Sequence, residues 1–399
     1  MVSSRPLEGL TVLDVTRVVA GPYCSMMLAD MGARVIKIEN PIDADYTRKF
    51  PPFLASGNSA FFAQYNRNKT GLSLNLKSDE GKEILKQLAT KSDVLVENFR
   101  PRTLTKLGIG YEVLKKLNPK LVYTAISGFG QTGPKSNRPS FDNTGQAESG
   151  LWSMNGYPNM PPVRVGTIVG DLAACLYGTI GTLAAVRQAE KTGVGQMVDV
   201  SQVDSTLALT ESAVMRFDLL NENTKPLGNE HSFVRPYEQF PCKDGYVFFG
   251  GYKDNHWETT LEIFGDLDLA KDPEIDSMEK RFDREVYERR IRPLINGWFS
   301  KFGKDELEEM LAEKVPLSPI KTIGEVINDA QTLSRNMIID MPVDDTFVKM
   351  LGTPIKLSAS DEPKLNKAPD LGEHNFDILT ELLEMDADQI AALKCRGVI

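Results

Sequence analysis

The stretch that decides the fold class is LTVLDVTRVVAGPYCSMMLADMGARVIKIE, residues 10–39. Residues 10–15, LTVLDV, are rich in β-branched side chains and predict a buried strand. Residues 23–32, YCSMMLADMG, predict a helix that stops at Gly32, and RVIKIE at 34–39 predicts a second strand. A strand, a helix and a strand within roughly 30 residues form a βαβ unit, in which the two strands run parallel.

The same alternation continues along the chain. It predicts strands at 72–76, 93–99, 121–127 and the start of 195–212, and helices at 80–91, at 103–119 as two short pieces, and from about Asp171 to Lys191. We therefore expect an α/β fold in which an open, parallel, Rossmann-like sheet carries helices on both faces.

The residue pattern of the sequence changes near residue 225. A polar, turn-rich segment is followed by the hairpin-like DGYVFFGGY at 244–252 and a charged helical region up to about residue 313. This pattern predicts a smaller α+β domain at 225–325. It splits a large domain into an N-terminal part, 1–224, and a C-terminal part, 326–399, that returns to it.

Composition excludes several classes of protein. The net charge of −9 over 399 residues argues against a nucleic-acid partner. The four cysteines form no CxxC pair, and the three histidines show no metal-ligand spacing, so we expect neither disulfides nor a metal site. The N-terminus lacks the features of a signal peptide. The apolar run at 172–186 falls short of the ~20 residues that cross a bilayer, which favours a buried helix and a soluble, cytoplasmic protein with no membrane partner.

A nicotinamide-dependent oxidoreductase is one alternative. Glu39 ends the first βαβ unit, where an acidic residue binds a ribose in dinucleotide-binding folds. However, the turn between Val15 and Tyr23 contains the single glycine Gly21 rather than the three of the fingerprint. Alternatively, Glu39 has a purely structural role, as a charged residue at the end of a strand on the solvated edge of the sheet.

Asp171 precedes the long apolar helix, which is the usual position of an N-cap aspartate. The positive end of a helix also favours an ionised carboxylate, and a carboxylate can attack an activated acyl group. The sequence therefore allows both a capping role and a nucleophilic role for Asp171.

Along most of its length the chain resembles the class III CoA-transferases, the CaiB/BaiF family of formyl-CoA transferase and the carnitine CoA-transferases. The matching stretches are 6–39, 66–85, 93–134, 138–150 (RPSFDNTGQAESG), 169–186 (VGDLAACLYGTIGTLAAV), 192–201 and 368–379 (APDLGEHNFDIL). The resemblance implies an acyl-CoA:carboxylate CoA-transferase that needs no permanently bound cofactor, because coenzyme A enters and leaves as a substrate. It also implies a homodimer of two interlocked chains.

The resemblance implies roles for particular residues. Asp171, in the family's GD position, is the expected nucleophile, forming a mixed anhydride and then an enzyme-bound CoA thioester. The residues expected to bind CoA are Arg17, Leu74, Lys77, Asn98, Phe99 and Lys106. Val19 and Phe141 are expected near the acyl group. Lys77 and Lys106 are suitable partners for CoA phosphates, although both also fit solvated helix ends.

Two departures from the family narrow the function. No counterpart of the glycine-rich loop of formyl-CoA transferase lies between Lys225 and Gly251, so we do not expect formyl or oxalate specificity; HSFVRPYEQF at 231–240 is a candidate lining for an acyl pocket. Phe141 stands where the family's 2-methylacyl-CoA racemases carry a histidine, and phenylalanine cannot accept a proton. The transferase is therefore favoured over the racemase, and the donor and acceptor acids stay open.

Overall fold

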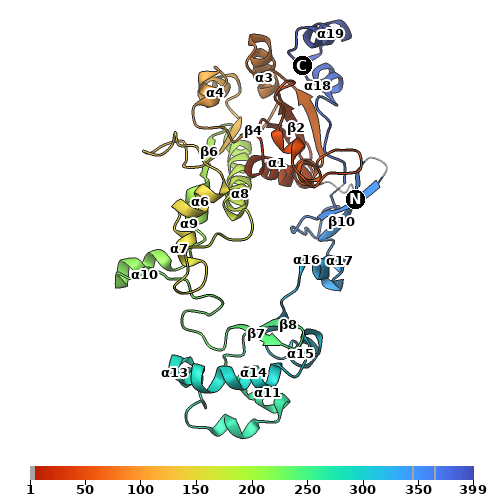
Figure 1. The fold of residues 1–399 in the computed structure, drawn as a ribbon. Helices are drawn as coiled ribbons and strands as arrows, with labels where there is room; N and C mark the ends of the chain where they lie inside the picture. Colours follow the sequence, from red (N-terminus) through yellow and green to blue (C-terminus); the bar gives the residue numbers. More distant parts are fainter. Residues whose placement is uncertain (1–4, 344–345, 364) are drawn as a thin grey trace. The chain divides into compact units, whose positions relative to one another are not determined.

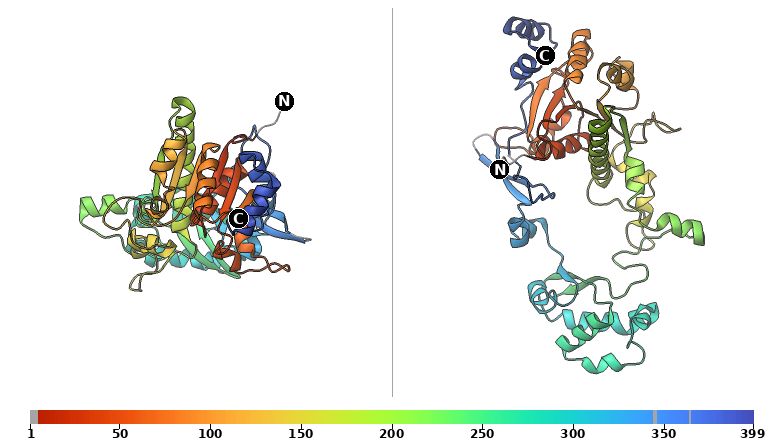
Figure 2. Two further views of the ribbon diagram at one scale, coloured as in Figure 1. Left: turned by 90° about the horizontal axis from the view of Figure 1, so that it is seen from above. Right: turned by 180° about the vertical axis from the view of Figure 1, so that it is seen from behind.

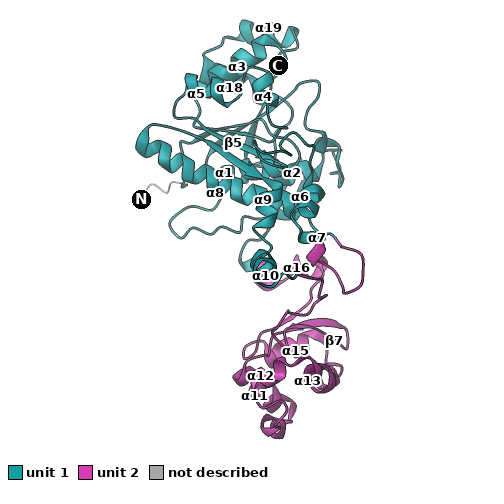
Figure 3. Ribbon diagram, turned by 90° about the vertical axis from the view of Figure 1, so that its left-hand side faces the viewer, with its two compact units in different colours: residues 1–152, 164–222, 333–399 teal, residues 153–163, 223–332 magenta. Residues whose placement is uncertain are grey.

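The computed structural model describes residues 5–343, 346–363 and 365–399. The chain forms two compact units (Figure 3): unit 1 comprises residues 1–152, 164–222 and 333–399, and unit 2 comprises residues 153–163 and 223–332. The sequence had assigned 153–163 to the large domain. This segment belongs to unit 2 because the Gly156 carbonyl accepts the backbone N–H of Gly228 at 2.8 Å and the Tyr157 hydroxyl accepts the Asn229 amide at 3.0 Å.

Unit 1 is built on a six-stranded sheet in the order β3-β2-β1-β4-β5-β6 (Figure 1). All five pairings are parallel, and this order is that of the doubly wound dinucleotide-binding sheet. The strands are β1 (Thr11–Asp14), β2 (Arg34–Glu39), β3 (Lys69–Ser73), β4 (Val94–Glu97), β5 (Val122–Ser127) and β6 (Met197–Ser201). The expected fold class is confirmed.

Helices cover both faces of this sheet. The helices of unit 1 are α1 (Ala20–Asp30), α2 (Ala60–Asn66), α3 (Asp79–Thr90), α4 (Thr103–Lys106), α5 (Tyr111–Leu117), α6 (Asp142–Glu148), α8 (Val169–Thr192), α9 (Gln202–Leu207), α10 (Ala213–Leu220), α18 (Asn375–Leu383), α19 (Ala387–Cys395) and the 3-10 helix η1 (Tyr46–Lys49). The short α7 (Leu151–Met154) and α17 (Ala330–Ser334) cross the boundaries between the units. Apolar side chains of α3, α5, α18 and α19 pack on one face, and those of α1 and α8 pack on the other.

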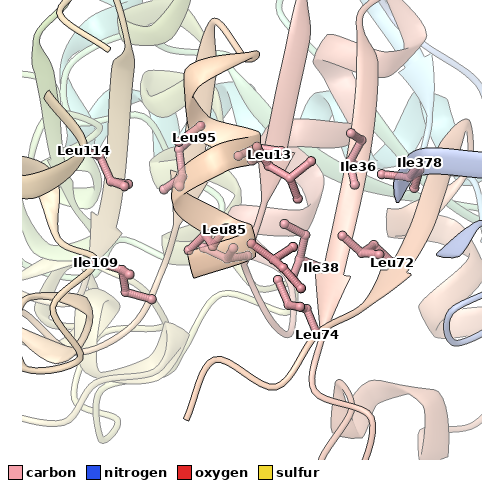
Figure 4. Packing of buried hydrophobic residues seen from close by; sticks show 14 of the residues in the cluster. Leu13, Ile36, Ile38, Leu72, Leu74, Leu85, Leu95, Ile109, Leu114 and Ile378 are labelled. Atoms are coloured by element: carbon pink, nitrogen blue, oxygen red, sulfur yellow. The ribbon is translucent and has the colours of Figure 1, made fainter. Parts of the chain in front are cut away.

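The C-terminal segment completes the core of unit 1. The side chain of Ile378 in α18 lies beside Ile36 and Leu72 of the sheet (Figure 4). The last residues, Val398 and Ile399, are buried in the same cluster. Residues separated by more than 300 positions therefore share one hydrophobic core.

Two element positions differ from those expected. Strand β3 covers Lys69–Ser73 rather than 72–76. The alternating LSLNL misled the sequence interpretation, because Lys69 is buried through an ion pair and Gly71 lies against Asp370, where a Cβ would be 2.8 Å from that carbonyl. Helix α1 begins at Ala20, three residues before the expected start, because Gly21 allows its first turn to lie against Thr16.

Helix α8 is longer than its apolar run suggested. It begins at Val169, two residues before Asp171, and its 24 residues are long and apolar enough to span a membrane by length and composition alone. Length alone therefore does not exclude a membrane span, contrary to the expectation. The helix packs against β5, β6 and α1, which is the environment of a core helix, and Figures 1 and 2 show it alongside the sheet of unit 1. Its outer face, including Leu176, Tyr177 and Ile180, is exposed in the single chain.

A small hairpin belongs to the C-terminal part of unit 1. Strands β10 (Ile338–Val343) and β11 (Thr346–Leu351) pair antiparallel. Met341, Val343 and Met350 pack against Ala63 of α2. This contact attaches the hairpin to the region that follows β2.

Unit 2 has its own core. A three-stranded antiparallel sheet in the order β7-β8-β9 packs against helices, with Phe240, Phe249, Trp257 and Phe299 among the buried residues. The elements are β7 (Glu238–Cys242), β8 (Gly245–Phe249), β9 (Leu317–Pro319), α11 (Asp254–Phe264), η2 (Leu267–Lys271), α12 (Met278–Phe282), α13 (Arg284–Val286), the π-helical turn η3 (Tyr287–Ile291), α14 (Arg292–Phe299), α15 (Lys304–Leu311) and α16 (Ile323–Val326).

Candidate active site

The candidate site lies at the carboxyl edge of the six-stranded sheet. The strand order reverses between β1 and β4, and ligands of open α/β sheets bind where the loops after two such strands diverge. Asn98, directly after β4, ties these loops together. Its Oδ1 accepts the backbone N–H of Arg17 at 2.8 Å, and its Nδ2 donates to the Arg17 carbonyl at 2.6 Å.

The loop after β1 holds a strained residue. Val18 has φ of 72°, a conformation that β-branched residues rarely adopt. Its backbone N–H donates to Asp45 Oδ2 at 3.0 Å, and Asp45 is itself paired with the buried Lys37 at 3.5 Å. Strain of this kind persists only where the surroundings fix the backbone, and it concentrates at functional sites.

A second buried ion pair, between Lys69 and Asp14, stabilises the same loop. Lys69 Nζ lies 2.8 Å from Asp14 Oδ2, and neither side chain is exposed. Burial alone would raise the pKa of Asp14, but the ammonium groups of Lys37 and Lys69 hold it well below its usual range. Burial lowers the pKa of Lys69 to about 8, although Asp14 opposes this shift. Lys37 also donates to the Thr16 carbonyl at 2.6 Å, which links the charges to the loop.

A cavity opens at this edge of the sheet. It brings together six residues that the sequence had singled out, Arg17, Val19, Asn98, Phe99, Phe141 and Asp171. They come from the loops after β1 and β4, the N-terminus of α6 and the first turn of α8. Phe141 is 67% exposed, and none of the chain's three histidines lines this cavity.

Asp171 is not the N-cap of α8. It lies in the first turn, and the terminus is capped from another helix: Oδ1 of Asp142 accepts the backbone N–H of Gly170 at 2.8 Å and that of Asp171 at 3.3 Å. Gly170 leaves room for this cap, because a Cβ there would lie 3.1 Å from Asp142 Oδ1. The Asp171 side chain is thus released from capping and is 9% exposed at the cavity wall.

The electrostatics of Asp171 also differ from the expectation. The pKa of its carboxyl is raised to about 7, first by burial and then by the negative charge of Asp142. A hydrogen bond from Gln202 acts in the opposite direction. Burial therefore outweighs the helix terminus that was expected to favour the ionised form.

Gln202 is a site residue that the sequence interpretation missed. It is the first residue of α9, directly after β6, and is 7% exposed. Its Nε2 donates to Asp171 Oδ1, and its Oε1 accepts the hydroxyl of Ser140 at 2.7 Å. The signal that could have found it is its position at the carboxyl end of a predicted parallel strand.

A second cavity adjoins the same loops. It contains Leu74 and Lys77 and shares Arg17 and Phe99 with the first cavity. Lys77 is exposed at its edge. Lys106 is also exposed, at the end of α4, but lines neither of these two cavities, so its part in CoA binding stays a prediction.

Glu39 does not lie on a solvated rim. Its side chain is buried, it pairs with Arg48 at 2.6 Å, and it accepts the backbone N–H of Asp45 at 3.1 Å. These bonds occupy the carboxylate that the oxidoreductase alternative required for a ribose. The strand order matches a dinucleotide-binding sheet, but the carboxylate of Glu39 is already bonded to Arg48 and to the backbone of Asp45.

The aromatic segment 231–240 belongs to unit 2. The ring of His231 packs edge-on against Phe233 at 4.7 Å and Tyr237 at 5.5 Å between centroids. Its expected role in an acyl pocket stays a prediction. All four cysteines lie among the described residues and are free thiols, and no group of three or more metal-ligating side chains occurs among those residues.

The fold and the cleft define an α/β enzyme with a buried carboxylate beside a ligand cavity at the switch point of a doubly wound sheet. The chain belongs to CoA-transferase family III, whose model matches residues 7–375. Enzymes of this family take CoA thioesters as substrates.

Characterised relatives match nearly the whole chain. A succinyl-CoA:mesaconate CoA-transferase of Haloarcula hispanica is 37% identical, over 94% of this chain and 96% of its own. A succinyl-CoA:D-citramalate CoA-transferase of Chloroflexus aurantiacus is 34% identical, over 99% of this chain and 98% of its own. The mouse succinyl-CoA:glutarate CoA-transferase is 32% identical, over 100% of this chain and 91% of its own.

A solved structure supports the same family assignment. A CaiB/BaiF family protein from Brucella suis superposes with a TM-score of 0.84 at 32% identity, covering 94% of this chain and 99% of that one. The expected family is confirmed.

Proposed function

We propose that this enzyme transfers coenzyme A from a dicarboxylic acyl-CoA, of which succinyl-CoA is the type, to a second dicarboxylic acid, with Asp171 as the nucleophile. The observation that carries the proposal is the buried Asp171 carboxylate at the wall of the switch-point cavity, among Arg17, Asn98 and Phe99.

The chemistry follows from the position of the carboxylate. Ionised Asp171 attacks the thioester carbonyl of the donor, a C–O bond forms, the C–S bond breaks, and CoA thiolate leaves with the electron pair. The product is a mixed anhydride between Asp171 and the donor acid. The thiolate then attacks the Asp171 carbonyl carbon and expels the donor acid, which leaves an aspartyl-CoA thioester. The acceptor carboxylate reverses these two steps and leaves as its CoA ester.

The two cavities suit the two parts of the substrate. In this proposal the thioester lies near Val19 and Phe141 beside Asp171, and Asn98 and Phe99 contact the pantetheine arm. Leu74 and Lys77 in the adjoining cavity, and Lys106 beyond it, contact the nucleotide end. Arg17 stands between them, because it lines both cavities.

The preference for dicarboxylic acids rests on two observations. The relatives named above carry succinyl and a second dicarboxylic acid in their names. In this chain, Arg17 and Arg100 line the same cavity as Asp171 and supply cations for a distal carboxylate.

The racemase alternative needs a base where Phe141 stands, and the cavity contains no histidine to replace it. We therefore keep the transferase alone. Free thiols are in keeping with the proposed cytoplasmic location.

We also propose the interlocked homodimer. Helix α10 has no buried residue, although Val214, Met215, Phe217, Leu219 and Leu220 are apolar and exposed. These side chains, like those on the outer face of α8, are exposed and apolar, as in surfaces that a partner chain covers.

A substrate panel tests the function. The enzyme is incubated with succinyl-CoA and equal amounts of C4–C5 dicarboxylic acids and monocarboxylic acids of matched length, and new CoA esters are measured by mass spectrometry. We expect esters of the dicarboxylic acids to exceed the others at least tenfold. Equal transfer to the monocarboxylic acids would contradict the substrate class, and transfer by Asp171→Asn at the wild-type rate would contradict the nucleophile.

A further inference from the structure

The side chain of Gln202 contacts the atom of Asp171 on which charge changes during turnover. Its Nε2 donates to Oδ1 of Asp171. A 180° flip of the Gln202 amide would break both of its hydrogen bonds. Its Oε1 accepts the Ser140 hydroxyl at 2.7 Å, and an ionised carboxylate accepts but does not donate hydrogen bonds, so Nε2 must face Asp171. A buried N–H donor is therefore fixed on one of the two carboxylate oxygens.

We propose that Gln202 is the oxyanion donor for the attacks on the Asp171 carbonyl carbon, that is, for formation and breakdown of the aspartyl-CoA thioester. The proposal rests on the proposed role of Asp171 as the nucleophile.

The charge on Oδ1 of Asp171 changes during the proposed reaction. When Asp171 first attacks the donor, its other oxygen forms the new bond, and Oδ1 becomes the carbonyl oxygen of the anhydride. When CoA thiolate attacks that carbonyl carbon, a C–S bond forms and the electron pair of the C=O bond moves onto Oδ1. The negative charge stays there until the anhydride C–O bond breaks and the donor acid leaves. A donor already placed on Oδ1 stabilises this charge without reorganisation.

Among the described residues, Gln202 is the side chain that hydrogen-bonds to the Asp171 carboxylate. Val19 and Phe141 line the cavity without a polar group. Asp142 accepts the backbone N–H groups of Gly170 and Asp171, so its carboxylate is engaged at the helix terminus. Gln202 also resists displacement, because it is buried and begins α9 at the end of β6.

The substitution Gln202→Met tests the proposal, because methionine matches the length of glutamine but cannot donate. Enzyme is mixed with succinyl-CoA without an acceptor and quenched on the millisecond to second scale. Hydroxylamine traps both the anhydride and the thioester at residue 171, whereas CoA that stays covalently bound to residue 171 after an acid quench reports the thioester alone. Peptide mass spectrometry measures both products over time.

We expect Gln202→Met to form the hydroxylamine-trapped species within threefold of the wild-type rate. We expect the CoA adduct at residue 171 to form about 100-fold more slowly, which is the usual effect of removing one oxyanion donor. Ser140→Ala, which removes only the bond that orients the amide, should slow the same step by a smaller factor and serves if Gln202→Met does not fold. Gln87→Met, at an exposed position of α3, is the matched control and should leave both rates unchanged.

The outcomes separate the two proposals. If the wild-type enzyme acquires no label at residue 171, the nucleophile is wrong. If residue 171 is labelled and the thioester forms at equal rates in wild type, Gln202→Met and Ser140→Ala, the oxyanion role of Gln202 is overturned.

Discussion

Asp142 caps the helix that carries Asp171: its Oδ1 accepts the backbone N–H of Asp171 at 3.3 Å, in addition to that of Gly170 at 2.8 Å. Asp142 thus accepts the backbone N–H groups at the N-terminus of α8, and the Asp171 carboxylate faces the cavity. The same arrangement sets the charge of Asp142 close to Asp171 and raises the pKa of the latter, in addition to the effect of burial.

The substitution Asp171→Asn should abolish transfer and stabilise the fold at alkaline pH. Because the pKa of Asp171 is raised to about 7 in the folded state, the folded protein binds this proton more tightly than the unfolded chain. Ionisation therefore costs stability progressively as the pH rises from about 4 to 7, and the full cost is present above that range. We expect Asp171→Asn to raise the free energy of unfolding at pH 8 by on the order of 2–4 kcal/mol and to change it little at pH 4.

Urea unfolding at the two pH values measures this difference. Asp268→Asn, at an exposed position in unit 2, is the control and should change stability at neither pH. A loss of stability in Asp171→Asn at pH 8 would show that the carboxylate supports the fold, as an N-cap would.

The pH profile of kcat/KM should have an acidic limb with a midpoint near 7, because in the proposed mechanism the free enzyme attacks only with ionised Asp171. Asp142→Asn should move that midpoint to lower pH. The neutral amide removes the repelling charge, and its oxygen can still accept the backbone N–H groups of α8. Initial rates between pH 5.5 and 9 with succinyl-CoA measure the midpoint; a midpoint unmoved by Asp142→Asn would contradict the coupling.

Asn98→Ala should weaken CoA binding about tenfold. It removes two hydrogen bonds to Arg17 and frees the strained loop around Val18, at a cost of about 1–3 kcal/mol in stability. Titration calorimetry with CoA measures the affinity. Asn118→Ala is the comparison, because the Asn118 side chain also bonds only to backbone groups: it donates to the carbonyls of Ala89 and Ser92 and accepts the N–H of Lys120. It should lose similar stability while keeping its CoA affinity; an equal loss of affinity in both variants would mean that general destabilisation is the cause.

Lys69→Met should destabilise the enzyme by about 3–5 kcal/mol, because it leaves the buried Asp14 without its closest counter-charge. The double variant Asp14→Asn with Lys69→Met should recover part of that loss. Urea unfolding of the full double-mutant cycle gives the coupling. Lys82→Met, at an exposed ion pair with Asp79, should have little effect. A double variant less stable than Lys69→Met would count against the ion pair as the cause.

Leu219→Glu in α10 should disrupt the proposed homodimer, because its side chain is 78% exposed in the single chain and a charge in a buried apolar interface is unfavourable. Sedimentation velocity should show a dimer for the wild type and a lighter or aggregated species for the variant. Leu117→Glu in α5 is the control and should stay dimeric. A monomeric wild-type enzyme would reject the interlocked homodimer outright.

Much of the fold could be predicted because its signals are local. The βαβ unit at 10–39 and the helix at 80–91 follow from periodicity within single elements, and both occur in the structure. Strand β3 was misplaced because Lys69 and Gly71 do not resemble strand residues until the buried Asp14 and the neighbouring Asp370 are known.

The sequence by itself determined the parallel α/β sheet, the family and six of the residues that line the switch-point cavity, since hydrophobic periodicity and motif order are properties of the sequence. Only the tertiary structure decided the hydrogen-bond partners and the pKa of Asp171. Its helix cap, Asp142, lies 29 residues away in the chain, and its hydrogen-bond donor, Gln202, lies 31 residues away. The pKa and the free lone pairs of a carboxylate depend on distances to such groups, and these distances exist only once the chain has folded.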